Sequence, residues 1–314
     1  MQHQDQVKVA IVQERPVYLD LQKSLQKAAR VSQEAAQQGV DLLVFGETWL
    51  CGYPAWIDYL PNIALWDYEP TAQVFLEMLE NGVEIPGKAI DQLSQMAADF
   101  GLYIVMGVNE RVQQGAGQGT LYNSLLIFDK QGQLAVHHRK LMPTYTEKLL
   151  YGTGDGHGLQ SIDTSFGKLG ALICWEHWMP LTRQTMHIAG ELIHIALWPA
   201  VKDLHQLASR HYAFESQSYV IAVGQILQVK DLPKALPLPQ ELAKTPDRYL
   251  LNGGSSIIGP DSAYIMEPQF ETENLLVHDI KDLNKAYKGR LKLDVSGHYN
   301  RPDVFDLKIN KRRL

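Results

Sequence analysis

Cys174 is the residue in this sequence with the clearest capacity for covalent chemistry. In the stretch KLGALICWEHWMP (residues 168–180), an apolar run, Leu169–Ile173, leads directly into the cysteine. A buried strand that ends in a turn exposes the sulfur, and the next helix begins with free backbone N–H groups near it. Taken alone, the cysteine is more simply a small buried hydrophobic residue, as most free cysteines are. The residues around it must decide between a nucleophile and a packed thiol.

Two more chemically useful residues follow predicted strands. Glu47 comes just after Asp41–Phe45, and Lys140 follows the strand expected at Gln133–His137. A thiol has a pKa of about 8.5, so little thiolate exists at neutral pH unless a base takes its proton. A carboxylate can accept that proton, and an ammonium group can stabilise developing negative charge. Alone, Glu47 could cap a loop and Lys140 could be a surface charge. The order Glu, Lys, Cys, each after a strand, is far more specific, because reactive side chains converge at strand ends.

The elements that carry these residues follow an α/β pattern. A strand at Val7–Val12, a helix at Leu19–Gln38 and a strand at Asp41–Phe45 form a strand–helix–strand opening with buried strands. A later strand is expected at Tyr219–Leu227, followed by an irregular Pro-rich excursion at 229–246. Because no repeat or composition break divides the 314 residues, we expect one domain over the whole chain, with a short C-terminal tail from about residue 300.

The composition argues against several classes of protein. With 45% hydrophobic and 20% charged residues, the chain is typical of a folded globular protein. A net charge of -6 disfavours nucleic-acid binding, which requires a concentrated basic surface. No apolar run approaches the ~20 residues needed to cross a bilayer. The two cysteines, Cys51 and Cys174, form no disulfide framework, and the N-terminal segment lacks the apolar core of a signal peptide. We therefore expect a cytoplasmic protein.

The segments around the three candidate residues resemble the nitrilase superfamily of carbon–nitrogen hydrolases. These segments are VFGETW at Glu47, HHRKLMPTYTEK at Lys140 and GALICWEHWMP at Cys174, with weaker matches in ALWPA, RHYAFESQSYV, GGSSIIGPD and SGHYNRPDVF. The resemblance covers nearly the whole chain, and CWEHWMP is typical of its nitrilase branch. It implies a four-layer α-β-β-α sandwich with Glu47 as general base, Lys140 as electrostatic stabiliser and Cys174 as nucleophile. It also implies that Glu147 is a second carboxylate that positions substrate or water.

The activity that this resemblance implies is hydrolysis of a small organic nitrile by water to a carboxylic acid and ammonia. The Cys174 thiolate would attack the nitrile carbon, and Lys140 and the backbone N–H of Trp175 would stabilise the thioimidate nitrogen. No metal or organic cofactor is required. An amidase or N-carbamoyl amide hydrolase with the same residues is the alternative. Superfamily members usually pair through the helix after the cysteine strand and the helix near Lys202–Ser218, so we expect a homodimer or a higher homo-oligomer.

Aromatic residues suggest a substrate pocket. The segment 48–70 holds three Trp, three Tyr and three Pro without a clear period, which is typical either of a pocket wall or of a packed cover over the core. Positions just past strands that carry or flank a candidate residue, or within the turn that follows Cys174, are the best pocket candidates. They are Tyr53, Trp56, Thr146, Trp175, His177, Trp198 and Pro199.

The histidines allow two other interpretations. His177 lies three residues after Cys174, so a Cys–His dyad is conceivable if the turn continues as a helix. Because Glu47 already serves as the base, His177 is more simply a residue that orients the pocket wall or a neighbouring side chain. The adjacent pair His137 and His138 points to opposite faces of a strand, and the sequence contains no H-E-x-x-H or C-x-x-C. We therefore expect no metal site.

Overall fold

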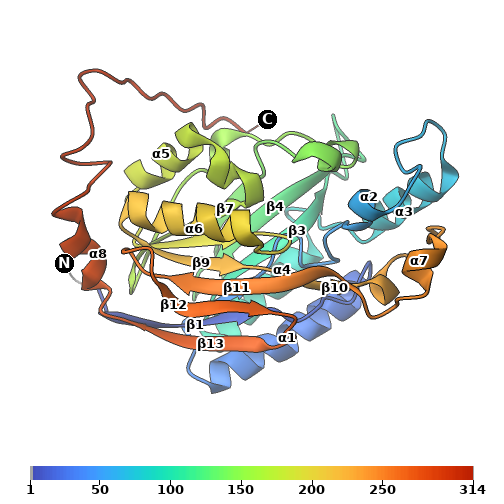
Figure 1. The fold of residues 1–314 in the computed structure, drawn as a ribbon, viewed down its shortest axis with the longest axis horizontal. Helices are drawn as coiled ribbons and strands as arrows, with labels where there is room; N and C mark the ends of the chain where they lie inside the picture. Colours follow the sequence, from blue (N-terminus) through green and yellow to red (C-terminus); the bar gives the residue numbers. More distant parts are fainter. Residues whose placement is uncertain (1–2, 314) are drawn as a thin grey trace.

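Two mixed β-sheets face each other between layers of helices (Figure 1). The structure is a computed structural model that describes residues 3–313. In the first sheet β1, β2 and β3 run parallel and the remaining neighbours pair antiparallel. Its strands, in spatial order, are β13 (Leu275–Lys281), β1 (Gln6–Val12), β2 (Leu42–Phe45), β3 (Tyr103–Arg111), β4 (Leu121–Phe128) and β5 (Leu134–Arg139).

The second sheet has a parallel centre, β7–β8–β9, with antiparallel neighbours on both sides. Its strands, in spatial order, are β10 (Ile226–Gln228), β11 (Tyr249–Ile258), β9 (Tyr219–Val223), β8 (Ile193–Leu197), β7 (Gly167–Ile173) and β6 (Ile162–Thr164), and β12 (Tyr264–Phe270) also pairs with β11. The strand expected before Cys174 is β7.

Helices cover the outer face of each sheet. α1 (Leu21–Gln37) and α4 (Lys88–Phe100) pack on the first sheet, and α5 (Pro180–Ile188) and α6 (Asp203–Ser216) pack on the second (Figure 1). This arrangement confirms the predicted four-layer α-β-β-α sandwich. The shorter helices are α2 (Trp56–Tyr59), α3 (Glu69–Glu80), α7 (Gln240–Ala243) and α8 (Asn284–Arg290), and the 3-10 turns are η1 (Tyr145–Leu149), η2 (Gly156–Gly158), η3 (Cys174–Trp178) and η4 (Val229–Asp231).

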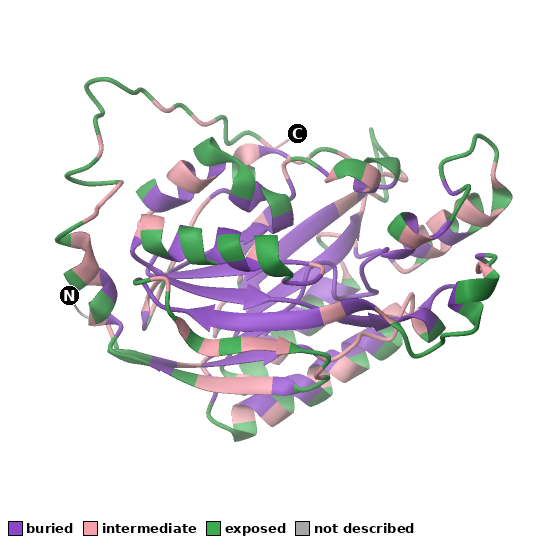
Figure 2. Cartoon of the chain, in the orientation of Figure 1, coloured by how far each residue is buried: buried purple, intermediate pink, exposed green. Residues whose placement is uncertain are grey.

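Burial on both faces explains the continuous apolar runs of the strands. In β1, Val9 and Ile11 enter the core between the sheets, whereas Ala10 and Val12 pack toward α1. Strands in such a sandwich have no solvated face, so their sequence does not alternate between apolar and polar residues. Figure 2 shows the central strands buried and the outer helices exposed on one side only. Within residues 3–313, no helix combines the length and the apolar character needed to cross a membrane.

The structure corrects the single strand expected at Tyr219–Leu227. This segment forms two strands, β9 and β10, which pair antiparallel with successive stretches of β11, at 256–258 and 249–252. The break falls at Gly224, where a Cβ atom would overlap the carbonyl oxygen of Gly253 on β11, and at Gln225, whose N–H bonds the carbonyl of Pro199 at 3.0 Å. The close approach of two backbones therefore interrupts an apolar run that is otherwise continuous.

The expected irregular excursion and the aromatic loop pack against each other. Trp56 and Ile57 from the segment 48–70 share one hydrophobic cluster with Leu236 and Leu242 from the excursion. In Figure 1 the corresponding elements, α2, α3 and α7, lie at the same end of the molecule. This cluster covers the ends of the strands that carry the candidate residues, because Tyr53, which contacts Glu147, belongs to it.

Candidate active site

Glu47 is held at the end of β2 with one carboxylate oxygen bonded and the other unpaired. It is fully buried. Its Oε1 accepts hydrogen bonds from Nδ2 of Asn123 at 2.7 Å and from Nζ of Lys140 at 2.9 Å. Its Oε2 has no hydrogen-bond partner among the described residues. Burial raises the pKa of Glu47 to about 7, with a further rise from Glu147 and an opposing effect of Lys140. A carboxyl group with a free oxygen and a pKa near neutrality suits proton transfer.

Lys140 lies between two carboxylates just past β5. Its Nζ is 2.9 Å from Oε1 of Glu47, and 2.9 and 2.7 Å from the two oxygens of Glu147. Burial lowers the pKa of Lys140, but Cys174, Glu47 and Glu147 outweigh that effect and hold it well above its usual value. The ammonium group therefore keeps its charge at neutral pH.

Glu147 is fixed by donors on both of its oxygens. It lies in η1, where its Oε2 accepts the N–H of Thr144 at 2.9 Å, and its Oε1 accepts the hydroxyl of Tyr53 at 2.8 Å. Together with Lys140, these contacts hold the carboxylate in one orientation. The second carboxylate predicted from the sequence therefore lies beside the first and on the same ammonium group.

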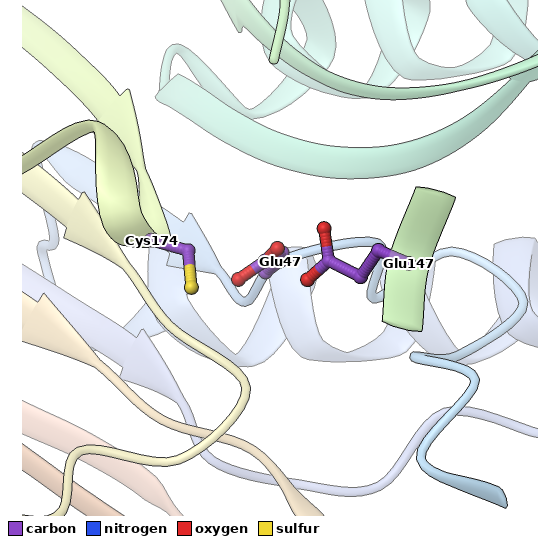
Figure 3. Close-up of side chains that lie close together, drawn as sticks. All are labelled: Glu47, Glu147 and Cys174. Atoms are coloured by element: carbon purple, nitrogen blue, oxygen red, sulfur yellow. The ribbon is translucent and has the colours of Figure 1, made fainter. Parts of the chain in front are cut away.

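Cys174 adopts a left-handed backbone conformation at the end of β7, with φ at +52°. Such a conformation is uncommon for a residue with a side chain and occurs most often at functional sites. The sulfur lies within 4.8 Å of carboxylate oxygens of Glu47 and Glu147. Figure 3 shows the Glu47 side chain between the other two. Burial raises the pKa of the thiol well above its usual value, Glu47 adds to that rise, and Lys140 opposes it. The resting thiol is therefore protonated and needs a base.

Glu176 ties together the two strands that carry Lys140 and Cys174. Its side chain accepts the N–H of Ile173 at 2.7 Å and the N–H of Leu141 at 2.8 Å, and it lies 2.9 Å from Nε2 of His138. Burial raises the pKa of Glu176, but His138 and the two amides outweigh that effect and hold it below its usual value. Sequence reasoning gave this residue no such role. The available clue was an acidic residue two positions after the cysteine.

The four candidate catalytic side chains line or adjoin one cavity of about 320 Å³. Of the predicted pocket residues, four line it: Tyr53, Thr146, Trp175 and Pro199. The cavity also has contributors that the sequence did not predict, because they come from separate loops without a shared motif. They are Ala55, Asp58, Tyr59, Thr144, Tyr145, Ala200, Lys202, His205, Leu250 and Leu251.

Three predicted pocket residues do not line the cavity. Trp56 is fully buried in the aromatic cluster, and Trp198 is buried with its Nε1–H donated to Ser209 at 3.2 Å. Trp198 follows the last residue of β8, and its neighbour Pro199, which lies in a bend, is the one that lines the cavity. His177 is buried beneath the turn, where its Nδ1 lies 2.7 Å from the carbonyl oxygen of Cys174. His177 and Trp198 instead stack on each other, with ring centroids 4.8 Å apart.

A Cys174–His177 dyad and a metal site both fit the geometry poorly. Both ring nitrogens of His177 are engaged away from the sulfur, one by the Cys174 carbonyl and one by His194. Within residues 3–313, the one group of three potential metal ligands is Glu47, Glu147 and Cys174, and its two carboxylates already share the Lys140 ammonium. Lys140 thus supplies the positive charge that a metal ion would bring.

Comparison with known proteins places this geometry in a family. The sequence model of the carbon–nitrogen hydrolases matches residues 8–288. An aliphatic nitrilase of Sinorhizobium fredii (strain HH103) is 35% identical, with 97% of this chain and 96% of that protein covered. A bifunctional nitrilase/nitrile hydratase of Nicotiana tabacum, NIT4B, is 36% identical over 96% of this chain and 85% of its own length.

Solved structures agree with the fold. A carbon–nitrogen hydrolase from Helicobacter pylori G27 is similar with a TM-score of 0.69 at 19% identity, over 93% of this chain and 94% of that one. The Saccharomyces cerevisiae protein Nit3, described as a member of branch 10 of the nitrilase superfamily, also has a TM-score of 0.69 at 19% identity, over 96% and 99% of the two chains. At this identity the likeness concerns the architecture alone.

Proposed function

The chain belongs to the carbon–nitrogen hydrolase family, and from this premise we propose that it is a nitrilase that converts an organic nitrile and water to a carboxylic acid and ammonia. The observation that carries the proposal is the buried cluster of Cys174, Glu47, Lys140 and Glu147 beside a cavity. Relatives named as nitrilases, at 35 and 36% identity over nearly the whole chain, support the nitrile as the substrate class.

Glu47 is the proposed general base. Its unpaired Oε2 is free to take the Cys174 proton, while Asn123 and Lys140 hold the other oxygen in place. The sulfur then attacks the nitrile carbon, one C–N π bond breaks, and the nitrogen takes the proton to give a thioimidate. Lys140 and the backbone N–H of Trp175 face the negative charge that develops during this step.

Hydrolysis completes the reaction in two balanced steps. One water adds to the thioimidate carbon, the C=N π bond breaks, and Glu47 passes a water proton to the nitrogen, which gives a tetrahedral intermediate. Glu47 then transfers the hydroxyl proton of this intermediate to the nitrogen, the C–N bond breaks, and ammonia leaves behind a thioester. A second water attacks the remaining thioester, the C–S bond breaks, and the acid departs while the Cys174 thiol is restored. Glu147, fixed by Tyr53 and Lys140, is placed to orient these waters.

The cavity favours a small nitrile. Its volume of about 320 Å³ lies at the lower end of the range for ligand pockets, roughly 300–1,000 Å³. The walls mix the aromatic rings of Tyr53, Tyr59 and Trp175 with Leu250 and polar groups. We therefore expect compact aliphatic or small aryl nitriles to be hydrolysed faster than bulky arylaliphatic ones.

An amidase or an N-carbamoyl amide hydrolase is the alternative function with the same residues. One relative is named a bifunctional nitrilase/nitrile hydratase, which supports release of some amide here as well. The amide would leave from the intermediate that forms when water adds to the thioimidate. A panel of nitriles and the matching amides, assayed for ammonia, acid and amide, separates these activities. Faster hydrolysis of every amide than of its nitrile would overturn the nitrilase proposal.

Substitution of the two cysteines tests the nucleophile directly. Cys174→Ala should abolish ammonia release, whereas Cys51→Ala should retain it, because Cys51 is a buried thiol whose sulfur donates to the carbonyl of Asn81. Full activity in Cys174→Ala would end the proposal. Iodoacetamide should inactivate the protein by labelling Cys174, and a bound nitrile should slow that labelling.

We also propose a homo-oligomer located in the cytoplasm. Support for assembly comes from exposed apolar side chains on α5 and α6, among them Leu181 at 69%, Leu204 at 66% and Phe214 at 51% exposure. Support for the location comes from Cys51 and Cys174, which are both free. Light scattering on the eluting protein tests the assembly, and Leu181→Glu should shift it toward the monomer.

A further inference from the structure

The carbonyl oxygen of Cys174 begins a hydrogen-bonded chain of buried side chains. It lies 2.7 Å from Nδ1 of His177, whose Nε2 lies 2.9 Å from Nε2 of His194. Nδ1 of His194 lies 3.0 Å from both oxygens of Glu191, and the Tyr212 hydroxyl donates to Oε2 of Glu191 at 2.6 Å. The four side chains are at most 1% exposed, so water cannot replace a missing hydrogen bond. Each contact in the chain must therefore have one hydrogen between its two atoms, so the position of one proton determines the positions of the others.

The acceptor at one end fixes the order of the protons. A carbonyl oxygen only accepts, so Nδ1 of His177 carries a hydrogen. Burial and the neighbouring His194 lower the pKa of His177 to about 3, so its Nε2 holds a lone pair. Nε2 of His194 must then donate to it. The bond between His194 and Glu191 also needs a proton, and burial raises the pKa of Glu191 to about 8, which favours the neutral acid as the donor.

Stacked rings keep the two imidazoles in the planes that this order requires. His194 stacks on Tyr212 with ring centroids 3.8 Å apart and planes at 23°. His177 stacks on Trp198 with centroids 4.8 Å apart and planes at 30°. Aromatic packing on one face of each ring fixes the ring plane, so a ring cannot turn aside to seek another partner.

Removal of the Glu191 proton would reverse the two hydrogen bonds that His194 makes and break the bond to the Cys174 carbonyl. If Glu191 were ionised, His194 would turn its only N–H toward the carboxylate and present a lone pair to His177. His177 would then carry its hydrogen on Nε2, and the lone pair of its Nδ1 would face the Cys174 carbonyl oxygen at 2.7 Å. Two facing lone pairs at that distance repel, and a buried unpaired acceptor is unfavourable.

We propose that Glu191, His194 and His177 form a positioning relay that holds the left-handed backbone of Cys174, and that the relay functions only while Glu191 is protonated. The strand that delivers the cysteine is built for this relay, because a Cβ atom at Gly170 of β7 would overlap Oε1 of Glu191. The proposal rests on Cys174 as the nucleophile of the proposed nitrilase. Loss of the relay lowers kcat and leaves KM unchanged, since none of the three side chains lines the cavity.

Other charged and titratable groups pack around the relay and set its electrostatic surroundings. They are Glu176 and Arg183 near His177, His187, Tyr212 and Glu215 from α5 and α6, and Arg290, which donates to the Glu191 carbonyl at 2.8 Å. Arg183 and His187 both bond Glu215, at 2.7 and 3.0 Å, so the Glu215 carboxylate largely balances the charge of the Arg183 guanidinium. Among the described residues, the Glu191 carboxyl group is bonded by His194 and Tyr212 and by no Arg or Lys.

Glu191→Gln is the decisive substitution. The amide has the same shape, donates Nε2–H to His194, accepts the Tyr212 hydroxyl and cannot ionise. Wild-type kcat for nitrile hydrolysis should fall as pH rises through about 8, the pKa of Glu191. In Glu191→Gln that fall should disappear, while kcat at neutral pH stays within about twofold of wild type and KM is unchanged.

Tyr212→Phe and Glu110→Gln serve as the second variant and the control. The Tyr212 hydroxyl lowers the pKa of Glu191, so its removal should move the alkaline fall of kcat to higher pH, an effect that a mere loss of packing would not produce. Glu110→Gln changes another buried carboxylate, which bonds His137 and Arg139 away from the relay. This control should keep the alkaline fall of wild type.

Each result decides one question. An unchanged alkaline fall in both Glu191→Gln and Tyr212→Phe, or its absence from wild type, would overturn the relay and leave the nitrilase proposal intact. Ammonia release by Cys174→Ala would instead overturn the nitrilase proposal. If Glu191→Gln does not fold, the direction of the shift in Tyr212→Phe still decides the relay.

Discussion

Glu47 and Glu110 are both buried carboxylates in the first sheet, yet their surroundings make them opposites. Glu47 is fully buried and Glu110 is 2% exposed. Glu110 accepts hydrogen bonds on both oxygens, from Ser124 at 2.6 Å, from Arg139 at 2.5 to 3.1 Å and from His137 at 2.8 Å. Among the described residues, Glu47 has donors on one oxygen only. Burial alone therefore does not distinguish a structural carboxylate from a reactive one.

The surroundings shift the pKa values of the two carboxyl groups in opposite directions. Burial raises the pKa of Glu110, but His137 and Arg139 outweigh it and hold the pKa at about 2. At Glu47 burial dominates, the nearby Glu147 adds to it, and Lys140 only partly compensates, so the pKa is about 7. A carboxylate surrounded by donors on both oxygens is stabilised as an anion and is a poor proton acceptor. The unpaired oxygen of Glu47 therefore fits the proposed role of general base.

Glu47→Gln should produce the largest effect, a fall in kcat of about 10²–10⁴-fold, because the amide cannot take the thiol proton. Stability should change by less than about 1 kcal/mol, since Lys140 keeps both contacts with Glu147 and no buried charge is left uncompensated. Ammonia release under saturating nitrile and urea unfolding measure the two quantities. Activity within tenfold of wild type would remove Glu47 from the role of base.

Glu110→Gln should have the opposite profile. The free energy of unfolding should fall by about 2–3 kcal/mol, because the largely buried Arg139 guanidinium loses one of its anionic neighbours. The kcat should stay close to wild type, as Glu110 does not line the cavity. Urea unfolding with an unchanged slope checks the loss of stability. A large loss of kcat with unchanged stability would erase the distinction between the two carboxylates.

The two carboxylates should also give stability opposite dependences on pH. Glu110, with a pKa lowered to about 2, contributes stability that is present above its unfolded pKa and is lost as pH falls toward 2. Glu47, with a pKa raised to about 7, contributes stability that is present below its unfolded pKa and is lost as pH rises through 7.

Unfolding free energies of wild type and the two Gln variants across pH test this sign. The difference in free energy of unfolding between wild type and Glu110→Gln should shrink on the acid side of about pH 4. The corresponding difference between wild type and Glu47→Gln should shrink as pH approaches 7. Differences that move in the same direction for both variants would contradict the assignment of their charge states.

The sequence predicted the strand ends well, because both sheets bury both faces of their strands and leave long apolar runs. The placement of Glu47, Lys140 and Cys174 follows from those runs. Pocket residues were harder to predict, since of the neighbours Trp198 and Pro199 the first is buried and the second lines the cavity. Roles that depend on hydrogen bonds across the sheets have no local pattern.

Glu176 and Glu191 show this limit most clearly. Glu176 receives amides from the ends of two different strands, next to Lys140 and Cys174. Glu191 reaches the cysteine only through two histidines from separate elements. Each residue appears in the sequence as an isolated acid, and only the pairing of distant segments in space gives it a function.

The smallest predicted effect concerns neighbours on β4 that divide the two carboxylates between them. Asn123 donates to Glu47 and Ser124 donates to Glu110, because consecutive strand residues point to opposite faces of the sheet. Asn123→Ala removes a bond that favours ionised Glu47, so its pKa should rise and kcat/KM at about pH 6 should fall about threefold further than at the optimum. Ser124→Ala should leave that acid limb unmoved and lower the free energy of unfolding by about 1 kcal/mol. Profiles of kcat/KM against pH for the pair measure the contrast, and an acid limb that shifts equally in both variants would show that the faces of the sheet do not separate reactivity from stability.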